Sequence, residues 1–116
     1  MRKIKIKIPL YTGDFIIIQT DDFKKVEDKY NLTDLNRYSA IAFSRPNKNE
    51  YSRYFMVCRS NVDAGIIAHE CLHIANNIFK DSGITTDNIN DEPHAYLLGW
   101  LVEECHKFLN IKKANA

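Results

Sequence analysis

The sequence lacks several features that mark whole classes of protein. No stretch approaches the roughly 18 consecutive apolar residues of a membrane-spanning helix. The N-terminal segment alternates lysine with isoleucine and has no apolar core of the kind that a secretory signal carries, so we expect no leader peptide. No internal repeat, low-complexity run or linker divides the 116 residues, which predicts a single domain spanning 1–116.

Cysteines are few, and the net charge is small. Cys58, Cys71 and Cys105 are widely spaced and include no C-x-x-C pair, which argues against a disulfide framework and for a reducing compartment. Each lies in a segment that we expect to be helix or strand, so the predicted role is a buried thiol. The net charge of +1 gives no general reason to expect binding to nucleic acid or to a membrane. These features predict a soluble, cytoplasmic protein.

Four segments have the composition of β-strands. Residues 2–8 alternate lysine and isoleucine with period two, and Phe15–Gln19 is apolar on both faces. Ser39–Ser44 and Tyr51–Arg59 flank a polar, turn-forming segment at 45–50. We expect two hairpins within a small, mostly antiparallel sheet of three to four strands. We assign the lysines of the first strand to a solvated face rather than to a recognition patch.

Three segments have helical periodicity. They run from about Thr20 to Asn31, from Ser60 to Gly83 and from about Asn90 to Asn110. In the second, Ser60 and Asp63 have a spacing that permits a capping-box-like start, the central stretch is Ala64–Asp81, and Gly83 is a good C-terminal stop. The order of elements predicts an α+β domain, with the second and third helices packed on one face of the sheet.

The second predicted helix contains the sequence His69-Glu70-Cys71-Leu72-His73, an H-E-x-x-H motif. Positions four apart lie on the same face of a helix, so both imidazoles can point at one metal ion. Glu70 follows the first histidine and is close enough to act as a general base on a water bound to that ion. This is the arrangement of zinc metallopeptidases.

A hydrolytic zinc site needs a third protein ligand, which normally comes from a separate element. The downstream candidates are Asp87, Asp91, Glu92, His94 and His106. Eighteen residues (74–91) separate His73 from Glu92. Glu92 and His94 are two positions apart, so on a regular helix their side chains point about 200° apart and only one of them can be the ligand.

This spacing resembles that of the gluzincins, whose pattern is H-E-x-x-H, a similar interval, and then a glutamate that opens another helix. The resemblance implies His69, His73 and Glu92 as zinc ligands and Glu70 as the general base. Residues 90–101 also look like the corresponding segment of small zincin-like proteins of phages and prophages. What the resemblance implies is a minimal zincin-like domain that binds Zn²⁺ and hydrolyses peptide or protein substrates.

Two features of the predicted third helix and one of the sheet bear on this expectation. Glu92, Ala95 and Gly99 fall on one helix face, where the two small residues would let this helix approach the motif helix closely. Tyr96 could donate a hydrogen bond to a developing oxyanion. The hairpin at 39–59 is the expected support for an extended peptide, which would add to its edge strand.

Two other interpretations of the motif stay open. A zinc-stabilised interaction or regulatory module of a phage or mobile element would keep the metal and lack catalysis, with a side chain such as His94 or Asp91 filling the water position. In a metal-free protein, His69 and His73 would be hydrogen-bonded residues of an ordinary helix. A metal ion whose fourth position is filled by a side chain would indicate the module, and one whose fourth position is open to water would indicate the peptidase.

Overall fold

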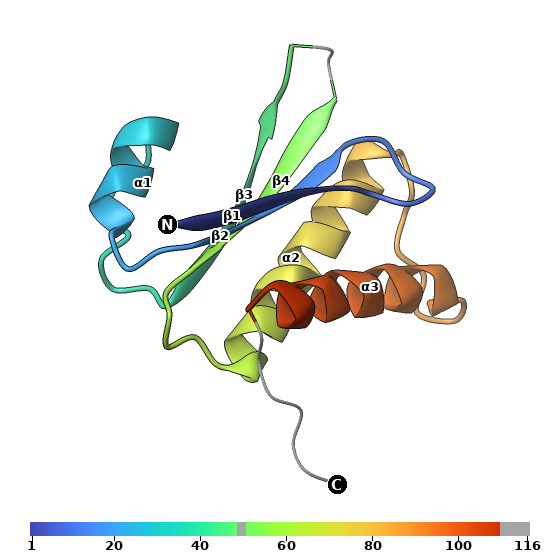
Figure 1. The fold of residues 1–116 in the computed structure, drawn as a ribbon. Helices are drawn as coiled ribbons and strands as arrows, with labels where there is room; N and C mark the ends of the chain where they lie inside the picture. The colour runs from blue at the N-terminus through green and yellow to red at the C-terminus, as the bar shows by residue number, and fades with distance from the viewer. Residues whose placement is uncertain (49–50, 110–116) are drawn as a thin grey trace, which may run out of the picture.

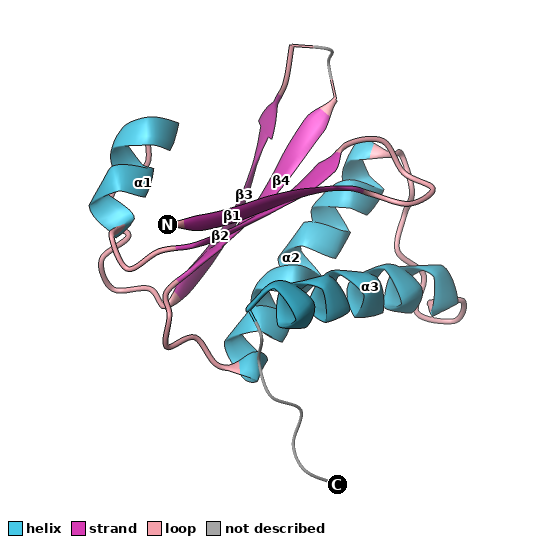
Figure 2. Cartoon of the chain, in the orientation of Figure 1, coloured by secondary structure: helices cyan, strands magenta, loops and turns pink. Residues whose placement is uncertain are grey.

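The computed structural model describes residues 1–48 and 51–109. Its elements are β1 (Arg2–Lys7), β2 (Asp14–Gln19), α1 (Phe23–Tyr30), β3 (Ala40–Pro46), β4 (Ser52–Cys58), α2 (Ala64–Asp81) and α3 (Glu92–Leu109). The strands form one sheet in the order β1-β2-β4-β3, with α2 and α3 on one face and α1 on the other (Figures 1 and 2). The expected α+β class is confirmed. None of the helices in these ranges is long and apolar enough to cross a membrane.

The sheet is built from two hairpins joined in the middle. β1 pairs with β2 and β3 with β4, both antiparallel, as expected. The hairpins meet through a parallel pairing of β2 with β4, where Ile17 lies opposite Met56, so the sheet is mixed. Arg45 and Pro46, which we expected in a turn, extend β3. We expected the third helix to end at about Asn110, which lies outside the described residues.

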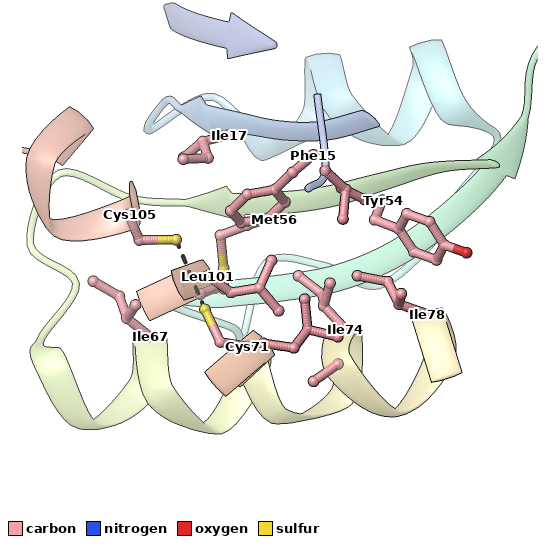
Figure 3. Close-up of a cluster of buried hydrophobic side chains, with 14 of the residues drawn as sticks. Phe15, Ile17, Tyr54, Met56, Ile67, Cys71, Ile74, Ile78, Leu101 and Cys105 are labelled. Atoms are coloured by element: carbon pink, nitrogen blue, oxygen red, sulfur yellow. Dashed lines mark hydrogen bonds between the residues drawn. The ribbon is translucent and has the colours of Figure 1, made fainter. Parts of the chain in front are cut away.

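Two hydrophobic clusters cover the two faces of the sheet. The larger lies between the sheet and the helices α2 and α3 (Figure 3), and includes Phe15, Ile17, Tyr54, Met56, Ile67, Cys71, Ile74, Ile78, Leu101 and Cys105. The smaller lies beneath α1 and consists of Ile16, Ile18, Phe23, Val26, Leu35, Phe55 and Val57. Successive residues of β2 and β4 therefore enter opposite clusters, which explains why neither strand alternates apolar with polar residues.

The ends of α2 are fixed by Asp63 and Gly83. Asp63 accepts a hydrogen bond from the backbone N–H of Ile66 through Oδ1 at 2.8 Å, so it is the N-cap. Ser60 instead donates its hydroxyl to Asp21 Oδ2 at 2.7 Å, so the capping box that its spacing from Asp63 permits does not form, and α2 begins at Ala64. Gly83 has φ +73° just beyond the helix, as its expected role as a stop requires.

The three cysteines are free and buried, as predicted. Cys71 of α2 and Cys105 of α3 bring their Sγ atoms to 3.8 Å across the helix contact (Figure 3). The hydrogen bond with Cys71, with burial, raises the pKa of the Cys105 thiol. Burial raises the pKa of Cys58 to about 12. Cys58 and Cys105 are therefore neutral near pH 7 and serve as core residues.

Gly13, in the turn between β1 and β2, leaves no room for a side chain. Its φ is +119°, and a Cβ there would stand 2.6 Å from the carbonyl oxygen of Ser52. We expect Gly13→Ala to lower the free energy of unfolding by about 2–4 kcal/mol, because it adds backbone strain to a steric clash. Urea denaturation measures the change.

The matched control for this substitution is Gly99→Ala. Gly99 lies within α3, and a Cβ there would meet no atom within 4 Å. The free energy of unfolding should therefore rise by up to about 1 kcal/mol through helix propensity alone. Equal stability changes in the two variants would show that the turn does not impose the geometry described here.

Candidate metal centre and groove

His69 and His73 lie one turn apart on an exposed face of α2. Their Nε2 atoms are 3.2 Å apart, and the ring planes meet at 78°. Two nitrogen ligands at about 2.05 Å from a tetrahedral zinc ion are separated by about 3.3 Å. This spacing fits two ligands of one zinc ion, and it is also hydrogen-bond distance between the two rings, as the metal-free interpretation expects.

Glu70 lies about 100° around the helix from His69, on the side of α2 that faces β3. The backbone N–H of Ala42, in β3, donates a hydrogen bond to its carboxylate. Burial raises the pKa of this carboxyl, and the neighbouring charges of His69 and His73 and the Ala42 hydrogen bond lower it. The net effect is a raised pKa. Glu70 is therefore a half-buried carboxyl held beside the two imidazoles, at the edge of the sheet.

A groove of about 580 Å³ runs along this side of α2. It is lined by Arg37, Tyr38, Ser39, Ala40, Asp63, Gly65, Ile66, His69 and Glu70. Its walls are the start of β3 with the segment before it and the N-terminal half of α2 (Figure 2). The first imidazole and the carboxyl of the motif therefore face an open space that a substrate segment can enter.

β3 is an edge strand of the sheet, and two groups on its outer side, the Ala42 N–H and the Ser44 carbonyl, already have partners in Glu70 and Arg45. The backbone N–H of Arg59 donates to the carbonyl of Ser39 at 2.9 Å, so Ser39 faces β4. Because an antiparallel strand turns alternate residues to alternate sides, the backbone groups of Ala40, Ala42 and Ser44 face outward. The hydrogen bond from Ala42 to Glu70 agrees with this alternation. An extended peptide on this edge would lie next to Glu70.

The first turn of α3 contacts α2 through His94 rather than through Glu92. His94 Nε2 lies 2.8 Å from Oδ1 of Asn76, and its ring packs on Phe79 with centroids 5.0 Å apart. Asn76 is three residues beyond His73, on the same face of α2. Glu92 is exposed and has no hydrogen bond or ion pair in the described part of the chain. His94 therefore contacts the face of α2 that carries His73, whereas the Glu92 carboxylate has no hydrogen bond or ion pair in the described residues.

Among the described residues, no third partner lies beside the two histidines. Within residues 1–48 and 51–109, no three His, Cys, Asp or Glu side chains form a group that could hold a metal ion. Asp87 and Asp91 are exposed, and His106 is partly buried near the other end of α3. The structure therefore places a histidine pair beside one carboxyl. The candidate third ligands, which follow His73 in the sequence, do not lie beside the pair.

The expectation that small residues bring α3 close to α2 is wrong. Gly99 is exposed, whereas Leu97, Leu101 and Cys105 form the buried face of α3. The apolar stripe decides which face of the helix packs inward, because its burial contributes more than the close approach that a small residue permits. Tyr96 is 75 % exposed and makes no hydrogen bond or ring contact in the described ranges.

Two participants in this geometry were not foreseen in the sequence. Asn76 could have been found, because it follows His73 at helical spacing. The Ala42 backbone N–H could not, because its contact with Glu70 depends on how β3 packs against α2. No protein-family model, curated protein or solved structure matches this chain. Its function is therefore inferred from the geometry of α2, α3 and β3.

Proposed function

We propose that the protein is a zinc-dependent peptidase, with His69 and His73 as metal ligands and Glu70 as the general base. The observation that carries the proposal is the 3.2 Å separation of the two Nε2 atoms on an exposed helix face. When bound, zinc would supply a coordinated water of lowered pKa and would polarise the peptide carbonyl. The adjoining groove and the edge strand β3 support a substrate of extended peptide.

Glu70 has the position and the chemistry of a general base. It takes the proton of the attacking water and later passes it to the leaving amine. A raised pKa makes its carboxylate a stronger proton acceptor near neutral pH, and the Ala42 N–H orients it. A peptide paired with the backbone of Ala40 and with the N–H of Ser44 would be held in extended form beside this carboxylate.

Glu92 is the third ligand in this proposal, and His94 holds α3 in place. The Glu92 carboxylate is exposed and has no hydrogen bond or ion pair in the described ranges, so no contact has to break before it turns toward the histidine pair. His94 already engages Asn76 and Phe79. These two contacts fix the first turn of α3, which begins at Glu92, against α2.

The two assignments predict opposite results for two alanine variants. Glu92→Ala should weaken zinc binding by roughly 100-fold or more, measured by competition with a chromogenic chelator, because it removes a ligand. His94→Ala should change zinc affinity by less than about tenfold, while it lowers the melting temperature through the lost contacts with Asn76 and Phe79. The reverse pattern would identify His94 as the ligand and refute the assignment of Glu92.

The function itself is tested by metal content and hydrolysis together. The purified protein should hold one zinc ion per chain and cleave an unstructured protein substrate. A chelator should stop the cleavage, and added zinc should restore it. Zinc without cleavage would favour a catalytically silent, zinc-stabilised module, which the exposure of both histidines and the open groove disfavour. Absence of zinc binding would contradict both.

A further inference from the structure

The face of the sheet that α1 partly covers is rich in cations. Paired residues in neighbouring strands point to the same face, so the strand register divides this face into three rows. From β1 to β3 the rows are Lys7–Asp14–Arg53–Arg45, Lys5–Ile16–Phe55–Phe43 and Lys3–Ile18–Val57–Ile41. Five of these twelve residues are cationic and one, Asp14, is acidic.

The cations of this face lie close together. Burial lowers the pKa of Lys3, and the charges of Lys29, Arg53 and Lys5 lower it further. Lys29 therefore adds a cation from α1 to those of the sheet. The ion pairs of residues 1–48 and 51–109 lie elsewhere, on Lys24 and Lys107. We use the name basic face for the set Lys3, Lys5, Lys7, Lys29, Arg45 and Arg53.

The two arginines are held in fixed positions. Arg45 donates to the carbonyl oxygens of Ser44 at 2.8 Å and Tyr30 at 2.9 Å. Arg53 donates to the carbonyl oxygen of Pro46 at 3.2 Å, and its guanidinium lies 5.5 Å from the ring centroid of Phe55. Side chains restrained in this way lose little further freedom when they bind an anion.

A groove of about 300 Å³ lies between the start of β1 and α1, next to Lys3. It is lined by Met1, Ile18, Lys25, Val26, Lys29 and Tyr30. Ile18 and Val26, which are buried, form its floor, and Met1 and the edge of the Tyr30 ring, which also packs on Phe43 and Phe55, form its walls. The two lysines supply positive charge at its rim. A ligand with a flat apolar ring and a nearby negative charge fits this combination.

We propose that the basic face binds single-stranded nucleic acid, with phosphates on its lysines and arginines and a base in the groove between β1 and α1. Protection of an edge strand explains lysines on β1. It does not explain Arg53, which lies on the interior strand β4, or Lys29, which lies on α1. Six cations gathered around a single carboxylate, Asp14, also cost stability, and a bound polyanion lowers that cost.

Single-stranded nucleic acid fits better than an acidic peptide or a duplex. The groove needs a planar, stackable group attached to an anion, which a nucleotide has and an aspartate or glutamate side chain lacks. A base in a duplex is stacked on its neighbours and cannot enter the groove without being extruded. The inference is independent of zinc, because the basic face lies on the opposite side of the sheet from α2 (Figure 2).

Fluorescence anisotropy with a short, labelled oligouridine tests the inference. The wild-type chain should bind it, and three phosphate contacts would weaken binding by about 20-fold between roughly 50 and 200 mM salt. The double variant Lys3→Glu and Lys29→Glu should bind at least about tenfold more weakly at the lower salt concentration. Its melting temperature should not fall, because the substitutions relieve repulsion.

The matched control is Lys48→Glu with Lys80→Glu, which changes the net charge equally at two exposed lysines outside the basic face. Its affinity should stay within a few-fold of the wild type. An equal loss in the control would overturn the proposal, as would absence of binding by the wild type. Competition by polyglutamate or by duplex RNA as strong as that by unlabelled oligouridine would also overturn it.

Discussion

Glu70→Gln is expected to lower kcat/KM for peptide hydrolysis by about 10³-fold, because general acid–base catalysis contributes rate factors of this order. Zinc content should stay at the wild-type level, since both imidazoles are untouched. The amide oxygen of Gln can still accept the hydrogen bond of Ala42, so the local structure should persist. Hydrolysis rate and metal content, measured on the same sample, check both parts of the prediction.

The control for this substitution is Glu103→Gln, the same chemical change on an exposed carboxyl of α3. It should keep full activity, which would separate the role of Glu70 from a general effect of charge. If Glu70→Gln hydrolysed substrate at the wild-type rate, Glu70 would not be the base. If it lost zinc together with activity, its role would be structural.

His73→Ala is expected to abolish zinc-dependent stabilisation. At a zinc concentration about 100 times its dissociation constant, binding to the wild type adds about 2.7 kcal/mol of stability. In a domain of this size that is a rise in melting temperature of roughly 10 °C over the value in chelator. The variant should melt at the same temperature with zinc and with chelator, and its peptidase activity should be lost.

Leu72→Ala is the control for the second prediction, because Leu72 lies within the same pentapeptide and is 41 % exposed. It should retain the full zinc-dependent shift in melting temperature. A His73→Ala variant that still gained stability from zinc would place the metal elsewhere on the chain. Calorimetry with and without chelator measures all four cases.

Local patterns in the sequence predicted the elements of this fold well. The period of two at 2–8, the apolar run at 15–19 and the glycine after α2 each depend on neighbouring residues, and each appears in the structure. The parallel pairing of β2 with β4 was not predicted, because it joins residues such as Ile18 and Val57 that lie 39 positions apart. Nothing in either strand alone specifies that partner.

In the candidate site too, the local features were predictable from the sequence and the contacts between elements were not. The convergence of His69 and His73 follows from helical spacing within one element. The place of Glu92 depends on which face of α3 packs inward, and that choice is made by Leu97 and Leu101 across the helix contact. The lysines of β1 were assigned to a solvated face, and the proximity of Arg53 to Lys3, on which the nucleic-acid proposal depends, follows from the pairing of the strands.

The central parallel pair also governs how fast this chain can fold. Each hairpin closes a short loop, but the union of β2 with β4 encloses the whole of α1 and β3. The entropy lost in closing a loop grows with its length, so we expect the slow event to be the meeting of two hairpins that have already formed. Doubling the length of the intervening segment would cost only about 0.6 kcal/mol at equilibrium. Its main effect would be to delay the moment at which the sheet becomes continuous.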